Sequence, residues 1–303
     1  MQRVFLFLKG MAMGAADVVP GVSGGTIAFI TGIYEELINS IQSISTEALP
    51  ALFKEGLPSA WKKANANFLL VLLSGIAVSV LSLAKGISHL LETQPVLVWS
   101  FFFGLIVASA VVVGKSVEKW NATAVIIMVA GIGLAYFITV ASPAKTPEAW
   151  WFIFLSGSLA ICAMILPGIS GSFILLLLGK YKYILNALSE LDLQTILLFL
   201  SGCVVGLLSF ARLLSWMFKH YKNTTIAMLT GFMIGSLNKV WPWKITTQTT
   251  LDRHGEEIPL TQKSVLPQNF DADPQLIWAL VAAIVGFAVI WVLESRSKIS
   301  AKT

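Results

Sequence analysis

Two short segments of this chain repeat proline, glycine and serine in the same order, and this pattern could bind an anion. The segments are Pro20-Gly21-Val22-Ser23-Gly24 and Pro167-Gly168-Ile169-Ser170-Gly171. An apolar run with helical character follows each of them. The first backbone N–H groups of a helix lack partners within the helix and carry the positive end of its dipole. Two such helix ends that face each other would form a cradle for an anion.

The residues predicted to bind this anion offer backbone N–H groups and hydroxyls around the two segments. They are Gly21, Ser23, Gly24, Gly25, Thr26, Gly168, Ser170, Gly171 and Ser172. Pro20 and Pro167 are predicted to break the helices, because proline removes a backbone donor. In the alternative interpretation, proline and glycine only shape a kink and a close helix crossing. The recurrence of the pattern favours binding.

Charged residues near these segments and within apolar runs are candidates for supporting roles. Lys85 and Arg212 lie past the middle of two predicted spans, where they could neutralise a phosphate. Alternatively, they extend to the membrane surface. Asp17, Glu35 and Glu36 are candidate proton carriers; alternatively, Asp17 caps a helix and the two glutamates are solvated.

A hydrolase is a less favoured interpretation. The run Gly21-Val22-Ser23-Gly24-Gly25 satisfies the G-x-S-x-G pattern of serine hydrolases. A nucleophilic serine needs a positioned base, and the three histidines fall near predicted span ends or in a loop. The duplication of the motif also argues against a single nucleophile.

The composition indicates an integral membrane protein. Of the 303 residues, 56% are hydrophobic and only 12% are charged, whereas soluble domains have about 25% charged residues. A disordered chain, a coiled coil, a disulfide scaffold and a nucleic-acid-binding module are excluded on this basis. The charged residues, which sum to a net charge of +5, lie mostly between the apolar runs. There they indicate on which side of the membrane each connection lies. No metal site or cofactor is expected, because the cysteines and histidines have no ligand spacing.

The apolar runs predict six spans and two broken hairpins. The spans are 68–91, 96–114, 121–140, 195–218, 224–241 and 275–293, and the hairpins are 4–41 and 149–187. The positively charged connections, including 219–222, lie on one side only if each hairpin returns to the side it entered. Each hairpin could be re-entrant or a pair of full spans, and charge does not separate the two. Backbone breaks at membrane depth need protein or a water-filled cavity around them, which favours re-entrant hairpins. Both termini are then predicted to be cytoplasmic.

An internal repeat relates the two halves of the chain. The motifs are offset by 147 residues, from 20 to 167, and the same offset pairs Tyr34 with Tyr181. Further along, the offset is 127, which pairs Lys85 with Arg212. Each half, 1–141 and 142–303, contains one hairpin and three spans, an odd number, so the halves are inverted. We therefore predict one all-α membrane domain with two inverted repeats, as in secondary transporters.

The two motifs resemble those of the bacterial polyprenyl-phosphate transporter family over essentially the whole chain. They are Gly14-Ala15-Ala16-Asp17-Val18-Val19-Pro20-Gly21-Val22-Ser23-Gly24-Gly25-Thr26 with Gly32-Ile33-Tyr34-Glu35, and Leu166-Pro167-Gly168-Ile169-Ser170-Gly171-Ser172. The resemblance implies a translocase that returns undecaprenyl phosphate from the outer to the cytoplasmic leaflet of the bacterial inner membrane. This recycling would support the synthesis of peptidoglycan and surface polymers.

The expected partners are therefore undecaprenyl phosphate, or a related polyprenyl phosphate, and membrane lipid. No nucleic-acid partner is expected, and the oligomeric state is left open, a homo-oligomer included. Proton coupling is a further expectation, on electrical grounds. The main alternative is a transporter or channel for a small soluble anion on the same scaffold.

Overall fold

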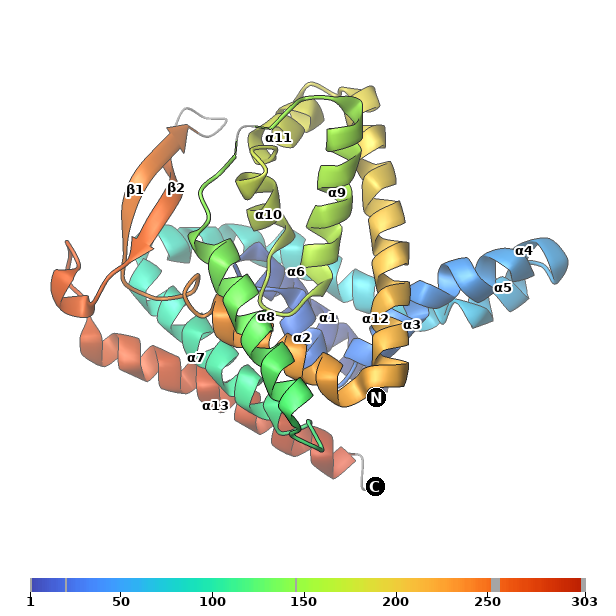
Figure 1. The fold of residues 1–303 in the computed structure, drawn as a ribbon, viewed down its shortest axis with the longest axis horizontal. Coiled ribbons are helices and arrows are strands. Elements are labelled where there is room, and N and C mark those ends of the chain that lie inside the picture. The colour runs from blue at the N-terminus through green and yellow to red at the C-terminus, as the bar shows by residue number, and fades with distance from the viewer. Residues whose placement is uncertain (1, 20, 145, 252–256, 301–303) are drawn as a thin grey trace.

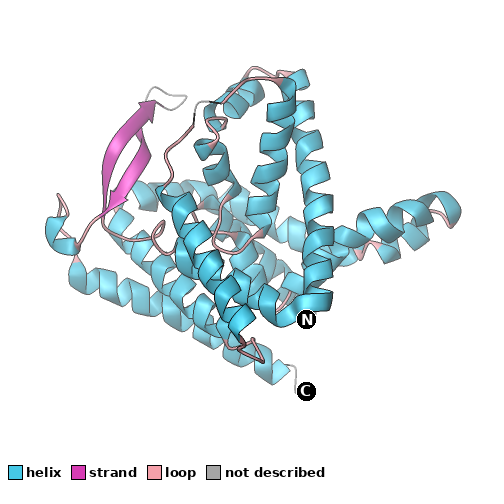
Figure 2. Ribbon diagram, in the orientation of Figure 1, coloured by secondary structure: helices cyan, strands magenta, loops and turns pink. Residues whose placement is uncertain are grey.

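The computed structural model describes residues 2–19, 21–144, 146–251 and 257–300, most of which are helical (Figure 2). Within these ranges, five helices are long and apolar enough to cross a membrane. They are α6 (Ala66–Thr93), α7 (Pro95–Gly114), α8 (Ala122–Val140), α12 (Leu193–Ser236) and α13 (Leu276–Ser300), the last counted as a span to Glu294. The helical membrane character predicted from composition is confirmed.

The predicted spans 195–218 and 224–241 form one long helix, α12. It is interrupted only at Tyr221, whose φ of −136° and ψ of 45° are not helical. This kink lies within the predicted connection 219–222, so the break in the pattern is in the expected place. The second part of α12 ends at Ser236 rather than at residue 241.

Each predicted hairpin consists of a helix, a break, a short helix and a turn into a third helix. The first comprises α1 (Gln2–Val18), α2 (Gly24–Ile30) and α3 (Tyr34–Ser43). The second comprises α9 (Trp150–Ile165), α10 (Gly171–Leu177) and α11 (Tyr181–Ser189). Gly21 and Gly168 have φ of +87° and +86°, a backbone conformation that favours glycine. Both breaks therefore contain a glycine with the same backbone conformation. Pro20 lies outside the described residues.

Close helix contacts recur within the two halves. α1 packs along α6, and α9 packs along the first part of α12. A Cβ on any of four glycines would clash with a backbone carbonyl of the neighbouring helix: Gly10 with Leu72, Gly75 with Phe7, Gly157 with Phe199 and Gly202 with Phe154. The contacts of the second half repeat those of the first. Residues 154 and 157 lie 147 residues after 7 and 10, and residues 199 and 202 lie 127 residues after 72 and 75.

Two further helix pairs join the halves to each other. α13 packs along α7, and the second part of α12 packs along α8. Again, four glycines allow the close approach: Gly104 to Ala283, Gly286 to Phe101, Gly231 to Met128 and Gly131 to Met228. Ala283 lies 155 residues after Met128, and Gly286 lies 155 residues after Gly131, so these contacts also recur at a fixed offset. Without side chains at these positions, backbones approach closely and the helices gain packing contacts.

An arm extends from the end of α3 and projects away from the other helices, at the right of Figure 1. It contains a π-helical turn (Ile44–Ala48), α4 (Leu49–Lys54) and α5 (Leu57–Lys63). Leu49, Leu52 and Phe53 are exposed along α4 with helical spacing. Hydrogen bonds from Lys63 and Ser59 lower the pKa of Glu55 in this arm. The arm returns the chain to α6.

The loop 242–274 contains a β-hairpin that the sequence did not predict. β1 (Lys244–Leu251) pairs antiparallel with β2 (Glu257–Ser264), with Lys244 opposite Ser264, and a 3₁₀ turn (Pro267–Asn269) follows. In Figure 1 the hairpin stands apart from the long helices. The base of the loop is fixed by two indole hydrogen bonds, from Trp241 Nε1 to the Val265 carbonyl (2.8 Å) and from Trp243 Nε1 to the Pro274 carbonyl (2.9 Å).

Candidate functional site

The two helix breaks contact each other directly, although they are far apart in the sequence. Ser23 Oγ donates to the carbonyl of Met164 at 3.0 Å, at the end of α9. The N–H of Gly168 donates to Thr26 Oγ1 at 3.1 Å. These bonds join the start of α2 to the second break. The structure therefore brings together Ser23, Thr26 and Gly168 of the predicted site.

Gly25 allows this close approach. A Cβ at this position would clash with the carbonyl oxygen of Ile165. Tyr34, at the start of α3, donates its hydroxyl to the same carbonyl at 3.2 Å. Tyr34 is only 2% exposed. The end of α9 is thus covered by residues of the first hairpin, and the contact between the breaks is a packed interface.

The first break uses its helix-start donors within the protein. The N–H of Gly24 donates to Asp17 Oδ1 at 2.7 Å, and the N–H of Gly25 donates to Ser23 Oγ at 3.1 Å. The N–H of Thr26 donates to the Ser23 carbonyl at 2.9 Å. In this conformation α2 offers none of these three N–H groups to a ligand. The predicted cradle of two open helix starts is thus closed on one side.

The second break is less enclosed. Ser170 precedes α10 with φ of −101° and ψ of 134°, much like Ser23 before α2. Its side chain does not cap the helix and instead shares a 2.8 Å hydrogen bond with the hydroxyl of Ser172. Ser172 is exposed, while Gly171 is buried. The two serine hydroxyls are free to reorient toward an incoming acceptor.

A small internal cavity of about 10 Å³ lies where the two breaks meet α8 and the end of α12. Its walls include Gly21, Gly168, Ser170, Phe173 and Lys239. The ammonium Nζ of Lys239 lies 4.0 Å from the centroid of the Phe173 ring. Lys239 was not predicted as a site residue, because it falls inside the predicted span 224–241. A lysine inside an apolar run was the signal that could have found it.

The two cations that were predicted to serve the site do not bond to the described residues of the breaks in this conformation. Lys85 on α6 and Arg212 on α12 are both exposed. Within the described ranges, neither residue has a hydrogen bond or an ion pair to either break. Their direct contact with a bound anion stays a prediction.

The three predicted proton carriers are divided between two environments. Asp17 lies beside the first break and accepts the hydrogen bond from Gly24. Glu35 forms an exposed ion pair with Lys222 at 3.1 Å, and Glu36 accepts from Asn65 Nδ2 at 3.0 Å. Only Asp17 thus contacts the region where the breaks meet.

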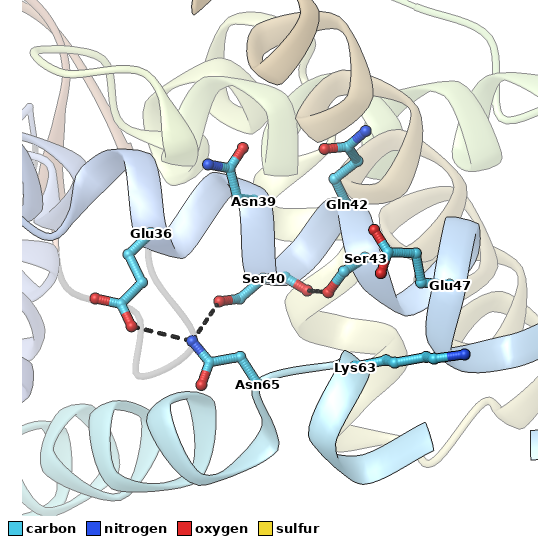
Figure 3. A pocket seen from close by; sticks show the side chains of 8 residues that line it. All are labelled: Glu36, Asn39, Ser40, Gln42, Ser43, Glu47, Lys63 and Asn65. Carbon is cyan, nitrogen blue, oxygen red and sulfur yellow. Dashed lines mark hydrogen bonds between the residues drawn. The ribbon is translucent and has the colours of Figure 1, made fainter. Parts of the chain in front are cut away.

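A larger cavity, of about 580 Å³, opens beside the arm (Figure 3). Its lining is polar and includes Glu36, Asn39, Ser40, Glu47 and Asn65. Figure 3 shows Asn65 bridging Glu36 and Ser40 across it. None of the lining residues belongs to either break, so this cavity is separate from the predicted site. Across the described ranges, no three His, Cys, Asp or Glu side chains gather as metal ligands would.

Comparison with known proteins places the chain in a family. A family model described as "VCA0040-like: Undecaprenyl phosphate translocase-like" matches residues 13–258. The chain belongs to this family. It is 45% identical to the polyprenyl-phosphate transporter of Vibrio cholerae over 302 residues, 98% of both chains. It is 32% identical to that of Staphylococcus aureus over 253 residues, 78% of this chain and 85% of the relative.

The resemblance read from the two motifs is thereby confirmed. Relatives named as transporters support a transporter rather than an enzyme, which argues against the serine hydrolase interpretation. No solved structure matches the chain significantly. Within this family the contact between the breaks, which involves the two motifs themselves, is the natural candidate for the site of transport.

Proposed function

We propose that this protein translocates undecaprenyl phosphate, or a related polyprenyl phosphate, from the outer to the cytoplasmic leaflet of the bacterial inner membrane. The observation that carries the proposal is the meeting of two glycine-containing helix breaks inside a membrane domain. Family membership supports the substrate class. Such transport would recycle the lipid carrier of peptidoglycan and surface-polymer synthesis.

We propose further that the two halves, 1–141 and 142–303, are inverted repeats with re-entrant hairpins and that both termini are cytoplasmic. The recurring glycine contacts at offsets of 147, 127 and 155 residues support this architecture. The matching φ values of Gly21 and Gly168 support it as well. In transporters built in this way, substrate sites lie near the membrane midplane, where broken helices meet.

The physical chemistry of the substrate fits a polar break. A phosphomonoester carries roughly −1.5 to −2 charges at pH 7. Moving even one such charge into hydrocarbon has an idealised cost of order 20 kcal/mol. A translocase must therefore provide hydrogen-bond donors and positive charge within the membrane. Ser170, Ser172 and Lys239 are groups of this kind at the second break.

Proton coupling would make inward transport less costly. Moving one negative charge against an interior-negative potential costs about 2.3 kcal/mol per 100 mV, and an accompanying proton offsets one charge. We propose that Asp17 carries this proton, because it contacts the first break, whereas Glu35 and Glu36 are less favoured carriers.

The variant Asp17→Asn tests this role. Asparagine keeps an oxygen that can accept from Gly24 but cannot take up a proton, so the fold should persist. We expect inward transport by the unaltered protein to accelerate when the outside is acidified, and transport by Asp17→Asn not to respond. Glu35→Gln and Glu36→Gln serve as controls that should keep the response. If Asp17→Asn retains the full response to the pH gradient, Asp17 is not the carrier.

The experiment that tests the function is leaflet exchange of labelled undecaprenyl phosphate in liposomes that contain the purified protein. Rapid exchange, absent from protein-free liposomes, is the expected result. Arg212→Ala and Lys85→Ala should each slow exchange by about tenfold if these cations bind the head group, as one charged hydrogen bond would suggest. Unchanged rates would favour extension of both side chains to the membrane surface.

The same liposomes distinguish lipid translocation from the main alternative, which is transport of a small soluble anion. No exchange above background, under an imposed pH gradient and potential, would contradict lipid translocation. Uptake of labelled inorganic phosphate under those conditions would then identify a small-anion transporter on the same scaffold.

A further inference from the structure

Lys239 differs from the other enclosed lysines in what its ammonium group contacts. Three other lysines each donate to a backbone carbonyl: Lys9 to Thr31 (2.7 Å), Lys180 to Thr146 (3.1 Å) and Lys244 to Lys239 (2.9 Å). The ammonium of Lys239 contacts the face of Phe173, and it has no hydrogen-bond acceptor or carboxylate partner among the described residues. An ammonium group has three N–H donors, and among these four lysines of the described residues only Lys239 uses none of them in a hydrogen bond.

Its position links it to both breaks. A Cβ on Gly21 would lie 2.5 Å from Cγ of Lys239, and a Cβ on Gly168 would lie 2.6 Å from Oγ of Ser236. Both break glycines therefore pack against the same short segment at the end of α12. Their missing side chains leave space for Lys239, and their positive φ values exclude most replacements.

The lysine is not a repeated packing element. The offset of 127 residues that relates the later helices of the two halves pairs position 239 with Val112. Val112 is buried and apolar. The charge of Lys239 is therefore not part of the packing that the two halves share.

From these contacts we infer that Lys239 binds the phosphate group of the transported lipid, with Ser170 and Ser172 as neighbouring hydroxyl donors. The inference rests on the proposed function and names the cation of its site. A charge removed from water is unfavourable unless it is paired. No described protein group accepts a hydrogen bond from the Lys239 ammonium, and the oxygens of a phosphomonoester would do so. The ligand chemistry is a phosphate dianion on a lipid; free phosphate is the other source of the same chemistry.

In this conformation the space beside Lys239 is too small for a phosphate group. A cavity of about 10 Å³ has room for one water molecule but not for a phosphate group. The ring of Phe173, on α10, occupies the face of the ammonium. Because the residues of α10 after Phe173 are only half-buried, a small shift of α10 would withdraw the ring and admit the phosphate from the side of Ser172.

Lys244 supports the position of the Lys239 backbone. Its ammonium lies 3.6 Å from the centroid of the Trp99 ring and donates to the backbone carbonyl of Lys239. This hydrogen bond holds the backbone that carries Lys239.

Binding of undecaprenyl phosphate and of uncharged undecaprenol to the purified protein in detergent tests the inference. We expect the unaltered protein to prefer the phosphorylated lipid by about 10- to 100-fold, the range for a hydrogen-bonded charge. Lys239→Met should lose this preference and bind both lipids alike, and Lys239→Arg should keep most of it. Lys182→Met, which changes an exposed lysine of α11 in the second hairpin, is the matched control and should bind normally.

The outcomes separate this inference from the proposed function. The melting temperature of Lys239→Met should not fall, because a half-buried cation without a hydrogen bond is replaced by an apolar chain of similar length. A folded Lys239→Met that keeps the phosphate preference overturns the role of Lys239 and leaves the proposed function standing. No preference in the unaltered protein overturns both. Displacement of the lipid by inorganic phosphate at similar concentrations would support the phosphate site and overturn its assignment to a lipid.

Discussion

Replacing Gly25 with leucine should destabilise the protein by about 3 kcal/mol or more and abolish transport. Overpacking a buried site usually costs about 1–3 kcal/mol, and more where the surroundings cannot move. At Gly25 the obstacle is the backbone carbonyl of Ile165, which belongs to the end of α9. Any side chain must therefore push the two breaks apart, and the hydrogen bonds from Ser23 and to Thr26 would be lost with the contact.

Gly133→Leu is the matched control, because it introduces the same side chain into a membrane span. A Cβ on Gly133, in α8, meets nothing within 4 Å. We expect its melting temperature in detergent and its rate of lipid exchange to equal those of the unaltered protein. A Gly25→Leu protein that melts and transports like Gly133→Leu would show that the breaks do not need to touch.

Much of this architecture follows from local sequence. The Pro-Gly-x-Ser-Gly motifs predicted both helix breaks, because proline and glycine each disfavour a continuous helix at those positions. The apolar runs predicted α6, α7 and α8 to within two residues and the start of α13 to within one, and they predicted α12 as two spans. The polar residues 219–222 predicted the interruption of α12, which the structure places at Tyr221. Each of these features depends on residues close together in the chain.

Features that depend on tertiary contacts could not be predicted. Ser23 and Ser170 occupy the same place in their motifs, yet Ser23 caps α2 and Ser170 does not cap α10. The two hydroxyls differ in their partners: Ser23 also donates to the Met164 carbonyl on α9, whereas Ser170 bonds to Ser172. Lys239 gains its importance only from contact with Gly21 and Phe173, which are remote in sequence.

The sequence also left open which face of each span contacts protein and which contacts lipid. A helix in a membrane can be apolar on all sides, so its sequence does not say which side meets protein and which meets lipid. Lys85 and Arg212 match at the repeat offset, which suggested a shared role at the breaks. Both side chains are exposed, so the repeat predicted equivalent environments for the two cations. Their role at the breaks stays a prediction.

Whether matched positions have equivalent contacts can be measured at Tyr34 and Tyr181, and the expected effect is large. Tyr34→Ala should destabilise the protein by about 3–5 kcal/mol, as for other large aromatic side chains removed from a core. The Tyr34 ring packs against Phe29 and Phe218, with centroids 5.1 and 5.9 Å away. Its hydroxyl also donates to the Ile165 carbonyl. Tyr34→Phe isolates that hydrogen bond and should cost about 1–3 kcal/mol, because the carbonyl is left unsatisfied.

Tyr181 is the counterpart of Tyr34 in the second motif, but its side chain is only half-buried. Tyr181→Ala should therefore cost less than about 1.5 kcal/mol in the same thermal or denaturant unfolding measurement in detergent. Equal losses at the two positions would mean that the second hairpin is packed as tightly as the first. Unequal losses would locate the rigid half of the site at the first break and leave the second break, with Ser170 and Lys239, as the half that can open to a phosphate.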